Sequence, residues 1–220
     1  MGISDVESIA GGEELSAYLT NLFVEEDASL ERARERQVEH GMPEINVSAY
    51  EGQLLLVLLK ALGARRVLEV GALGGYSGIW IARAIGEDGD LVTLECDSKH
   101  AEVAAAAFRD AEVDGRIEIL VGDALASMKS LAGPFDAIFL DADKEPLPRY
   151  FEQSMRLLRE GGLLLCDNTF MGGRVVDEDS RDAGVEGMRS FNELVSNDDR
   201  LSSSVIPVRD GLLVAVKNRD

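Results

Sequence analysis

Oxygen-bearing side chains follow two apolar runs in the second half of the chain. Asp141 comes directly after the run FDAIFL, and Asp167 and Asn168 come directly after the run GLLLC. Neighbouring parallel strands end at the same edge of a sheet, so these three oxygen donors are expected to lie side by side. Oxygen ligands without His or Cys suit a hard divalent cation. Mg²⁺ fits best, with Mn²⁺ or Ca²⁺ as alternatives, because it keeps water positions that a substrate's oxygens can take.

Asp and Asn are also common turn formers at strand ends, which offers a purely structural reason for the same residues. Lys144 lies three positions after Asp141. A basic side chain beside three oxygen donors favours the cation site over the turn interpretation, and it gives the site a group that can exchange a proton.

A glycine-rich segment, VLEVGALGGYSG, lies between a predicted strand and a predicted helix, where ligands bind in open α/β sheets. The dinucleotide fingerprint G-x-G-x-x-G is absent, because Gly71 is followed by Ala72 and Leu73, so the segment is weak support for NAD. Glu69 places a carboxylate inside a buried strand, where an unpaired charge is costly. A ligand ammonium or hydroxyl would satisfy it, and a salt bridge to a neighbouring Arg is the alternative.

Acidic residues also close the next two predicted strands. Glu95 follows LVTL, at a position where an acid commonly hydrogen-bonds the ribose hydroxyls of an adenosine ligand. The alternative for Glu95 is an ordinary residue ahead of a helix. Asp123 follows RIEILVG and is expected to cap the next helix, while the nearby backbone meets an adenine ring.

Strands and helices alternate from residue 65 onward. Strand patterns fall at 65–71, 90–96, 116–123, 135–143 and 162–168, and helical patterns fall at 76–86, 97–113, 124–133, 147–161 and 185–198. This alternation predicts an α/β fold, a mostly parallel sheet with helices on both faces. The segment 201–217 predicts two further strands around Asp210-Gly211, since Asp-Gly is a strong hairpin signal.

The first 45 residues predict a helical extension ahead of this core. Helical spacing of apolar residues is seen at Leu15, Tyr18, Leu19, Leu22 and Phe23. A charged helix follows, which predicts a solvated face or a subunit contact, with a lid over a site as the alternative. A long apolar helix then runs from about 48 to 62. With no repeat or linker, residues 1–220 are predicted to form one domain, with the extension at 1–45 and the core at 46–220.

Composition narrows the partners and the compartment. The formal net charge of -19 argues against nucleic acid or an anionic membrane as the main partner, because both require a cationic face. No apolar stretch approaches the roughly 20 residues that cross a bilayer, and the first residues lack the features of a signal peptide. Cys96 and Cys166 end apolar runs and are expected to be reduced core residues. The predicted location is the cytoplasm.

In this order, the segments VLEVGALGGYSG, VTLECD, GDA, FLDADK and CDNTFMGGRVV resemble the cation-dependent O-methyltransferases, a family that includes catechol and caffeoyl-CoA O-methyltransferases. The resemblance runs from about Ile45 to the C-terminus, and the DADK and DN segments are its specific part. It implies a Rossmann-like class I methyltransferase fold, with a seven-stranded, mostly parallel sheet and an antiparallel C-terminal hairpin. The family is often dimeric, and the N-terminal helices could supply that contact.

The resemblance implies a role for each matching residue. The methyl donor, S-adenosylmethionine, would be bound by Val47, Glu69, Gly71, Ala72, Ser77, Glu95, Asp123, Ala124 and Asp141. Among these, Glu69 to Ser77 would hold the methionine part, Glu95 the ribose, and Asp123 with Ala124 the adenine edge. Mg²⁺ would be bound by Asp141, Asp167 and Asn168. Lys144 would be the general base, with its pKa lowered by the nearby cation.

The implied reaction methylates one of two adjacent hydroxyls on a catechol-like small molecule. Both oxygens would chelate the cation, which would lower the pKa of the hydroxyl that Lys144 deprotonates. The resulting oxygen would attack the donor methyl in line. Leu147 stands where many members have Tyr, and Asp143 where the catechol enzyme has Trp. Both departures touch the acceptor side, so the reaction type is better supported than the acceptor.

Three other functions compete with this one. Some bacterial relatives methylate a wobble-uridine hydroxyl of tRNA, which the net charge disfavours, although Arg32, Arg34 and Arg36 could form a local basic patch. A donor-binding module without catalysis is disfavoured because the set of Lys144 and the cation ligands is complete. An NAD oxidoreductase is disfavoured by the missing fingerprint.

Overall fold

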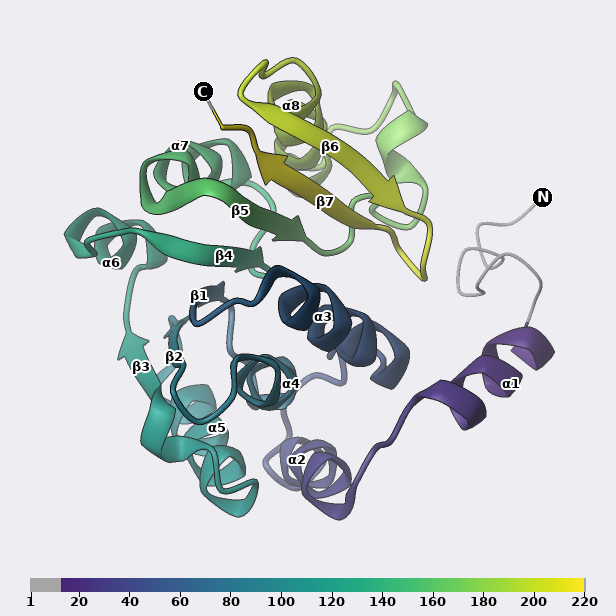
Figure 1. Cartoon of the computed structure of the whole chain (residues 1–220). Coiled ribbons are helices and arrows are strands. Elements are labelled where there is room, and N and C mark those ends of the chain that lie inside the picture. Colours follow the sequence, from purple (N-terminus) through teal and green to yellow (C-terminus); the bar gives the residue numbers. More distant parts are fainter. Residues whose placement is uncertain (1–12, 220) are drawn as a thin grey trace. The chain divides into compact units, whose positions relative to one another are not determined.

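The computed structural model of the chain describes residues 13–219, drawn in Figure 1. The residues form two compact units, one of Thr20–Leu131 and one of Met1–Leu19 together with Ala132–Asp220. The division into a helical extension and a single core domain stays a prediction. The part of the extension before residue 13 lies outside the described residues.

The unit Thr20–Leu131 is built on three parallel strands in the order β3-β2-β1. Its strands are β1 (Arg66–Val70), β2 (Asp90–Glu95) and β3 (Ile117–Val121). Its helices are α2 (Ala28–Glu39), α3 (Ala49–Leu62), α4 (Tyr76–Ile85), α5 (Ser98–Asp110) and α6 (Ala124–Ser130), with the short 3₁₀ turn η2 (Asp114–Arg116). Helix α4 contacts β1 and β2, and α5 contacts β2 and β3. Alternation of strand and helix therefore places every strand end next to a helix start, as the sequence predicts.

Local signals fix the ends of these helices. Helix α3 begins with a capping box, in which the Ser48 hydroxyl accepts from the Glu51 N–H and the Glu51 carboxylate accepts from the Ser48 N–H. It ends at Gly63, whose φ of 68° a residue with a side chain would rarely adopt. Helix α1 (Glu13–Phe23) crosses the boundary residue between the units and leaves Tyr18, Leu22 and Phe23 exposed.

The second unit carries the remaining four strands in the order β4-β5-β7-β6. These are β4 (Phe135–Leu140), β5 (Leu158–Cys166), β6 (Leu201–Ile206) and β7 (Leu212–Lys217), accompanied by α7 (Leu147–Leu157), η3 (Arg174–Val176) and α8 (Ala183–Ser196). β4 and β5 pair in parallel, whereas β7 runs antiparallel to both β5 and β6. The predicted seven-stranded, mostly parallel sheet with an antiparallel C-terminal hairpin is confirmed.

One predicted boundary is wrong. The sequence predicts a helix over 147–161, but α7 ends at Leu157 and β5 begins at Leu158. Leu158 pairs with Phe135 of β4, and both side chains are buried. Strand pairing and burial thus override the helical propensity of the segment RLLRE.

The cysteines correct a second expectation. Both are free thiols, as predicted, and Cys166 is buried, but Cys96 is exposed and not part of the core. Cys96 follows the last residue of β2, where the chain leaves the buried strand. No helix among residues 13–219 is long and apolar enough to cross a membrane.

Candidate active site

Glu69 in β1 is fully buried and is held by two hydroxyls of its own unit. Its Oε1 accepts from Ser77 Oγ at 2.6 Å, and its Oε2 accepts from Thr93 Oγ1 at 2.7 Å. Thr93 is the residue paired with Glu69 on β2, whereas Ser77 lies in the first turn of α4. The carboxylate therefore fixes the start of α4 against the strands. Sequence reasoning missed Thr93, because its place opposite Glu69 depends on the strand register.

The glycine-rich loop between β1 and α4 is held in conformations that need small residues. Gly71 has a φ of 104°, Gly75 has a φ of 86°, and Leu73 between them has a φ of 46°. The Gly71 N–H donates to Leu94 O at 2.9 Å, and Ala72 is buried. Gly75 is the N-cap of α4 and has no side chain to accept from the first N–H groups of that helix. An open helix N-terminus favours a negatively charged ligand group such as a carboxylate.

Glu95 at the end of β2 joins this loop to the next helix. Its Oε2 accepts from the Leu73 N–H at 2.8 Å, and its Oε1 accepts from the Asp97 N–H at 3.0 Å. His100 Nδ1 lies 3.7 Å from the same Oε1. A carboxylate has about four lone-pair positions, so these bonds leave capacity for two ligand hydroxyls. The ribose role of Glu95 stays a prediction.

The other predicted donor residues lie on the same unit without printed contacts to Glu69 or Glu95. Asp123 caps α6, and its Oδ1 accepts from the Ala126 N–H at 2.7 Å, which confirms the capping prediction. Ala124 is the first residue of α6 and is half-buried. Val47 is buried directly before the cap of α3.

In the second unit, the predicted cation ligands come together at the ends of β4 and β5. Leu140 pairs with Cys166, so Asp141 and Asp167 are the next residues along two neighbouring strands, and the Asp167 N–H donates to Leu140 O at 3.1 Å. Asn168 Nδ2 donates to Asp167 Oδ2 at 3.2 Å. Asn168 has a φ of 61°, a conformation that Asn tolerates better than most residues.

This donor set fits a hard divalent cation. Two carboxylates and one carboxamide supply oxygen only, and Asp167 is 3% exposed, so its charge has little help from water. Lys144 offsets one of the two negative charges, which leaves a net negative site. No three His, Cys, Asp or Glu side chains gather closely enough to hold a metal within residues 13–219. The predicted set is not of that kind, because its third ligand is an amide.

Lys144 Nζ lies 3.0 Å from Asp141 Oδ1, with most of its side chain buried. Burial acts to lower the pKa of Lys144, but the charge and hydrogen bond of Asp141 and the charge of Asp167 outweigh it, so the pKa is raised. The protein's own groups therefore keep Lys144 protonated. The lowered pKa expected from the sequence would require the positive charge of a bound cation. Burial raises the pKa of the neighbouring Cys166 thiol to about 12, so Cys166 is not a thiolate ligand.

Two supporting residues were missed at the sequence level. Gly187 of α8 packs against the backbone of Lys144 and Glu145, where a Cβ would lie 2.8 Å from Glu145 Cα. Asp210, in the turn between β6 and β7, accepts from the Gly172 N–H at 2.7 Å, and burial raises its pKa. A glycine inside a predicted helix is the signal for the first. The second was taken only as a hairpin residue.

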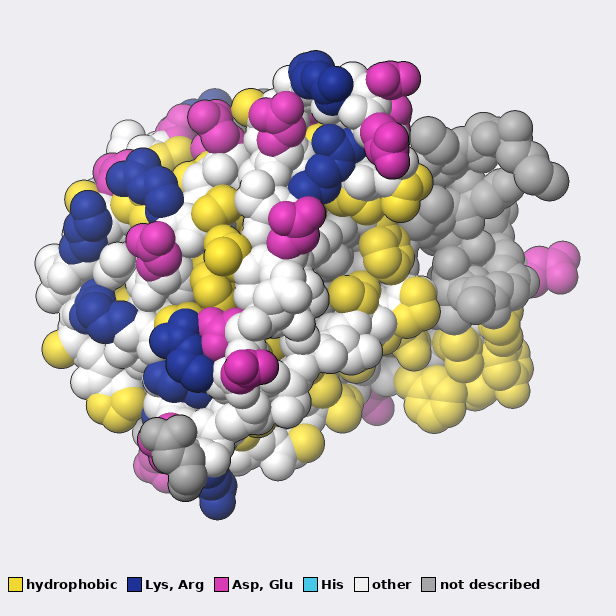
Figure 2. Space-filling view, turned by 90° about the horizontal axis from the view of Figure 1, so that it is seen from above, with side chains coloured by type: hydrophobic (Ala, Val, Ile, Leu, Met, Phe, Trp, Pro, Cys, Tyr) yellow, Lys and Arg dark blue, Asp and Glu magenta, His cyan; other side chains and the backbone are white. Residues whose placement is uncertain are grey.

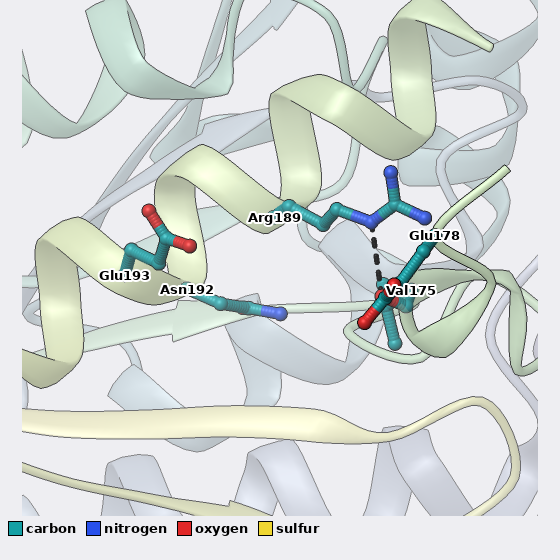
Figure 3. Close-up of a pocket in the computed structure, with 5 residues that line it drawn as sticks. All are labelled: Val175, Glu178, Arg189, Asn192 and Glu193. Carbon is teal, nitrogen blue, oxygen red and sulfur yellow. Dashed lines mark hydrogen bonds between the residues drawn. The ribbon is translucent and has the colours of Figure 1, made fainter. Parts of the chain in front are cut away.

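A cavity of about 540 Å³ lies beside the segment that follows Asn168, as Figure 3 shows. Its lining residues are Val175, Glu178, Arg189, Asn192 and Glu193. Arg189 of α8 orders the segment by donating to the carbonyls of Val175, Ser180, Arg174 and Asp177. Asn192 Nδ2 donates to the carbonyl of Thr169, the residue after Asn168.

Comparisons with known proteins cover nearly the whole chain. A family model described as O-methyltransferase matches residues 16–218. A catechol O-methyltransferase of Niastella koreensis is 38% identical over 213 residues, 93% of this chain and 96% of that protein. A catechol O-methyltransferase of Mycobacterium tuberculosis is 40% identical over 194 residues, 88% of each chain.

Solved structures agree with these relatives. The O-methyltransferase TomG from Streptomyces achromogenes, in complex with S-adenosylmethionine, superposes with a TM-score of 0.89 at 38% identity, covering 94% of this chain and 97% of TomG. An O-methyltransferase from Bacillus cereus, in complex with S-adenosylhomocysteine, gives a TM-score of 0.89 at 36% identity, covering 93% and 97%. The chain belongs to the O-methyltransferase family and is an S-adenosylmethionine-dependent enzyme of the catechol and caffeoyl-CoA O-methyltransferase-like group.

Proposed function

We propose that the enzyme transfers the methyl group of S-adenosylmethionine to one of two adjacent hydroxyls on a catechol-like small molecule, and that the reaction requires a divalent cation, with Mg²⁺ preferred. The observation that carries this proposal is the cluster at the ends of β4 and β5. There Asp141, Asp167 and Asn168 gather oxygen donors, and Lys144 lies 3.0 Å from Asp141.

The unit Thr20–Leu131 would bind the donor. The open N-terminus of α4 and the backbone at Gly71 and Ala72 would take the methionine carboxylate, because that is where N–H groups and positive dipole are available. Glu69 would hold this loop through Ser77 and approach the methionine ammonium. Glu95 would accept from the ribose hydroxyls, and Asp123 with Ala124 would border the adenine.

The cluster of the second unit would bind the acceptor. A cation held by Asp141, Asp167 and Asn168 would supply a positive charge that lowers the pKa of a neighbouring hydroxyl. Lys144, with most of its side chain buried beside Asp141, would take the proton from that hydroxyl. The acceptor oxygen would then attack the methyl carbon as the bond from methyl to sulfur breaks, which leaves S-adenosylhomocysteine.

The charge distribution supports a small acceptor over a nucleic acid. The three arginines of the possible basic patch on α2 are each paired with a carboxylate: Arg32 with Glu35 and Glu39, Arg34 with Glu26, and Arg36 with Asp110. Figure 2 shows basic and acidic side chains interspersed over one face of the molecule. With a net charge of -19, such a surface offers little continuous positive potential to a phosphate backbone.

Two further proposals concern the setting of the enzyme. The exposed apolar residues Tyr18, Leu22 and Phe23 of α1 support a homodimer, because a second copy would remove them from water. The two free thiols support a reducing compartment such as the cytoplasm.

The test is methyl transfer to a panel of catechols by the wild type, Lys144→Met, Asp167→Asn and the surface control Asp199→Asn. Lys144→Met keeps the length of the side chain and removes its proton-accepting nitrogen. Loss of 10²–10⁴-fold in rate is expected for Lys144→Met, and a comparable loss for Asp167→Asn, with the control unchanged. Full turnover of Lys144→Met at neutral pH would remove Lys144 from the chemistry.

A further inference from the structure

Gln37 is a buried amide on a helix that is otherwise strongly charged. The residues of α2 that face inward are Leu30, Ala33 and Gln37, and Gln37 is 1% exposed. An apolar side chain would fill this position at no polar cost, whereas a buried amide destabilises the fold unless its N–H and C=O groups are hydrogen-bonded. The partners of Gln37 therefore indicate what the side chain is for.

The partners lie in the segment that joins α2 to α3. Gln37 Oε1 accepts a short hydrogen bond from Asn46 Nδ2, and Gln37 Nε2 donates to Pro43 O at 3.4 Å. The main chain adds a bond from the Met42 N–H to Gln37 O at 3.0 Å. The amide thus fixes the course of residues 43–46, immediately before Val47.

The other side of the same amide rests against the glycine-rich loop. A Cβ at Gly74 would lie 2.6 Å from Gln37 Cδ and 2.8 Å from Gln37 Oε1, which is closer than real Cβ contacts allow. Gly74 therefore leaves room for the Gln37 side chain to pack on the loop backbone. One residue earlier in that loop, the Leu73 N–H donates to Glu95 Oε2 at 2.8 Å.

We propose that Gln37 is a positioning residue for donor binding: its amide holds the 43–47 segment and the 71–75 loop in one arrangement, so that both reach the donor together. The proposal rests on the donor role given above to Val47, Gly71 and Ala72. Gln37 does not touch the reacting atoms, and its effect is on donor affinity through preorganisation.

The test compares Gln37→Leu with Arg36→Gln. Leu fills the same space without the two hydrogen bonds, whereas Arg36→Gln removes the ion pair from α2 to Asp110 of α5 and leaves the amide untouched. The probe is S-adenosylhomocysteine, with its Kd measured by calorimetry in the absence of acceptor and cation. Gln37→Leu is expected to raise the Kd about tenfold, and Arg36→Gln to change it less than twofold. Amide hydrogen exchange at residues 44–47 is expected to accelerate only in Gln37→Leu.

A double-mutant cycle with Asn46→Ala sharpens the assignment. If the Gln37–Asn46 bond carries the effect, the losses of affinity are non-additive, and the double variant resembles Gln37→Leu alone. Wild-type affinity in Gln37→Leu would overturn the inference, as would equal losses in Gln37→Leu and Arg36→Gln, since α2 packing in general would then be responsible. A wild-type chain that does not bind S-adenosylhomocysteine would overturn the donor site itself, and this inference with it.

Discussion

Gly187 allows α8 to approach the backbone of Lys144 and Glu145 more closely than any side chain would permit. A Cβ at this position would lie 2.8 Å from Glu145 Cα and 2.9 Å from Glu145 O, and closer still to the Lys144 carbonyl oxygen. Ordinary van der Waals contact begins at 3.4 Å, so Gly187→Ala must move one of the two backbones by at least 0.6 Å. The atoms in the way are main chain, and a side-chain rotation cannot relieve the contact.

A shift of this size displaces Lys144 relative to Asp141. Misplacement of a catalytic group by about 1 Å costs about 10²-fold in rate, so Gly187→Ala is expected to lower the rate of methyl transfer roughly 10- to 100-fold. The assay is single-turnover transfer to a catechol with saturating donor and Mg²⁺. The Kd for S-adenosylhomocysteine should stay within twofold of the wild-type value, because the donor residues lie on the other unit.

Gly184→Ala in the same helix is the matched control. Its Cβ would meet the ends of side chains, 3.1 Å from Asp182 Oδ1 and 3.4 Å from Met171 Cε, and these can rotate away. Both variants gain the same helix propensity, about 1 kcal/mol from replacing Gly by Ala. Wild-type turnover in Gly187→Ala, or an equal loss in Gly184→Ala, would refute the link between α8 packing and the position of Lys144.

Three further outcomes are expected. Thr93→Val removes a hydroxyl donor from the buried Glu69 carboxylate without changing shape, and should lower the free energy of unfolding in urea by about 1–3 kcal/mol; an unchanged value would contradict the role of this bond. Burial acts to raise the pKa of Asp27, but hydrogen bonds from Ser29, Arg83 and the Leu30 N–H lower it below 3.8. Its stabilising effect is therefore present above pH 3.8 and is lost as pH falls through the lowered pKa. Asp27→Asn should flatten this part of the stability profile, and a profile identical to wild type would argue against the shift. Light scattering after size exclusion should give twice the mass of one chain, and one chain mass for Tyr18→Ser/Phe23→Ser; a wild-type monomer would contradict the proposed dimer.

The arrangement of the cation cluster was predictable because it depends on topology. Asp141, Asp167 and Asn168 each follow a run that could only be a buried strand, and parallel strands end at one edge whatever their exact register. The hairpin at Asp210-Gly211 was predictable for a similar reason, since its signal is confined to two residues. In both cases a local pattern was enough.

Features that depend on register or on distant packing were not predictable. Thr93 meets Glu69 only because residues of β1 and β2 pair in that register. The helix over 147–161 stops at Leu157 because Leu158 finds a strand partner in Phe135, which lies more than twenty residues away. Gln37 stands in a segment so rich in Arg and Glu that a solvated face was the natural interpretation, and its burial follows from contacts with Asn46 and Gly74.

The proposed cation dependence of the reaction is tested most directly by removing the cation. Methyl transfer from S-adenosylmethionine to a catechol should be measured with Mg²⁺, with EDTA, and with Mg²⁺ restored in excess, together with the Kd for S-adenosylhomocysteine under each condition. Asp141, Asp167 and Asn168 predict that EDTA abolishes transfer, that Mg²⁺ restores it, and that donor affinity changes little. Transfer that continues undiminished in EDTA would contradict the cation site at the ends of β4 and β5.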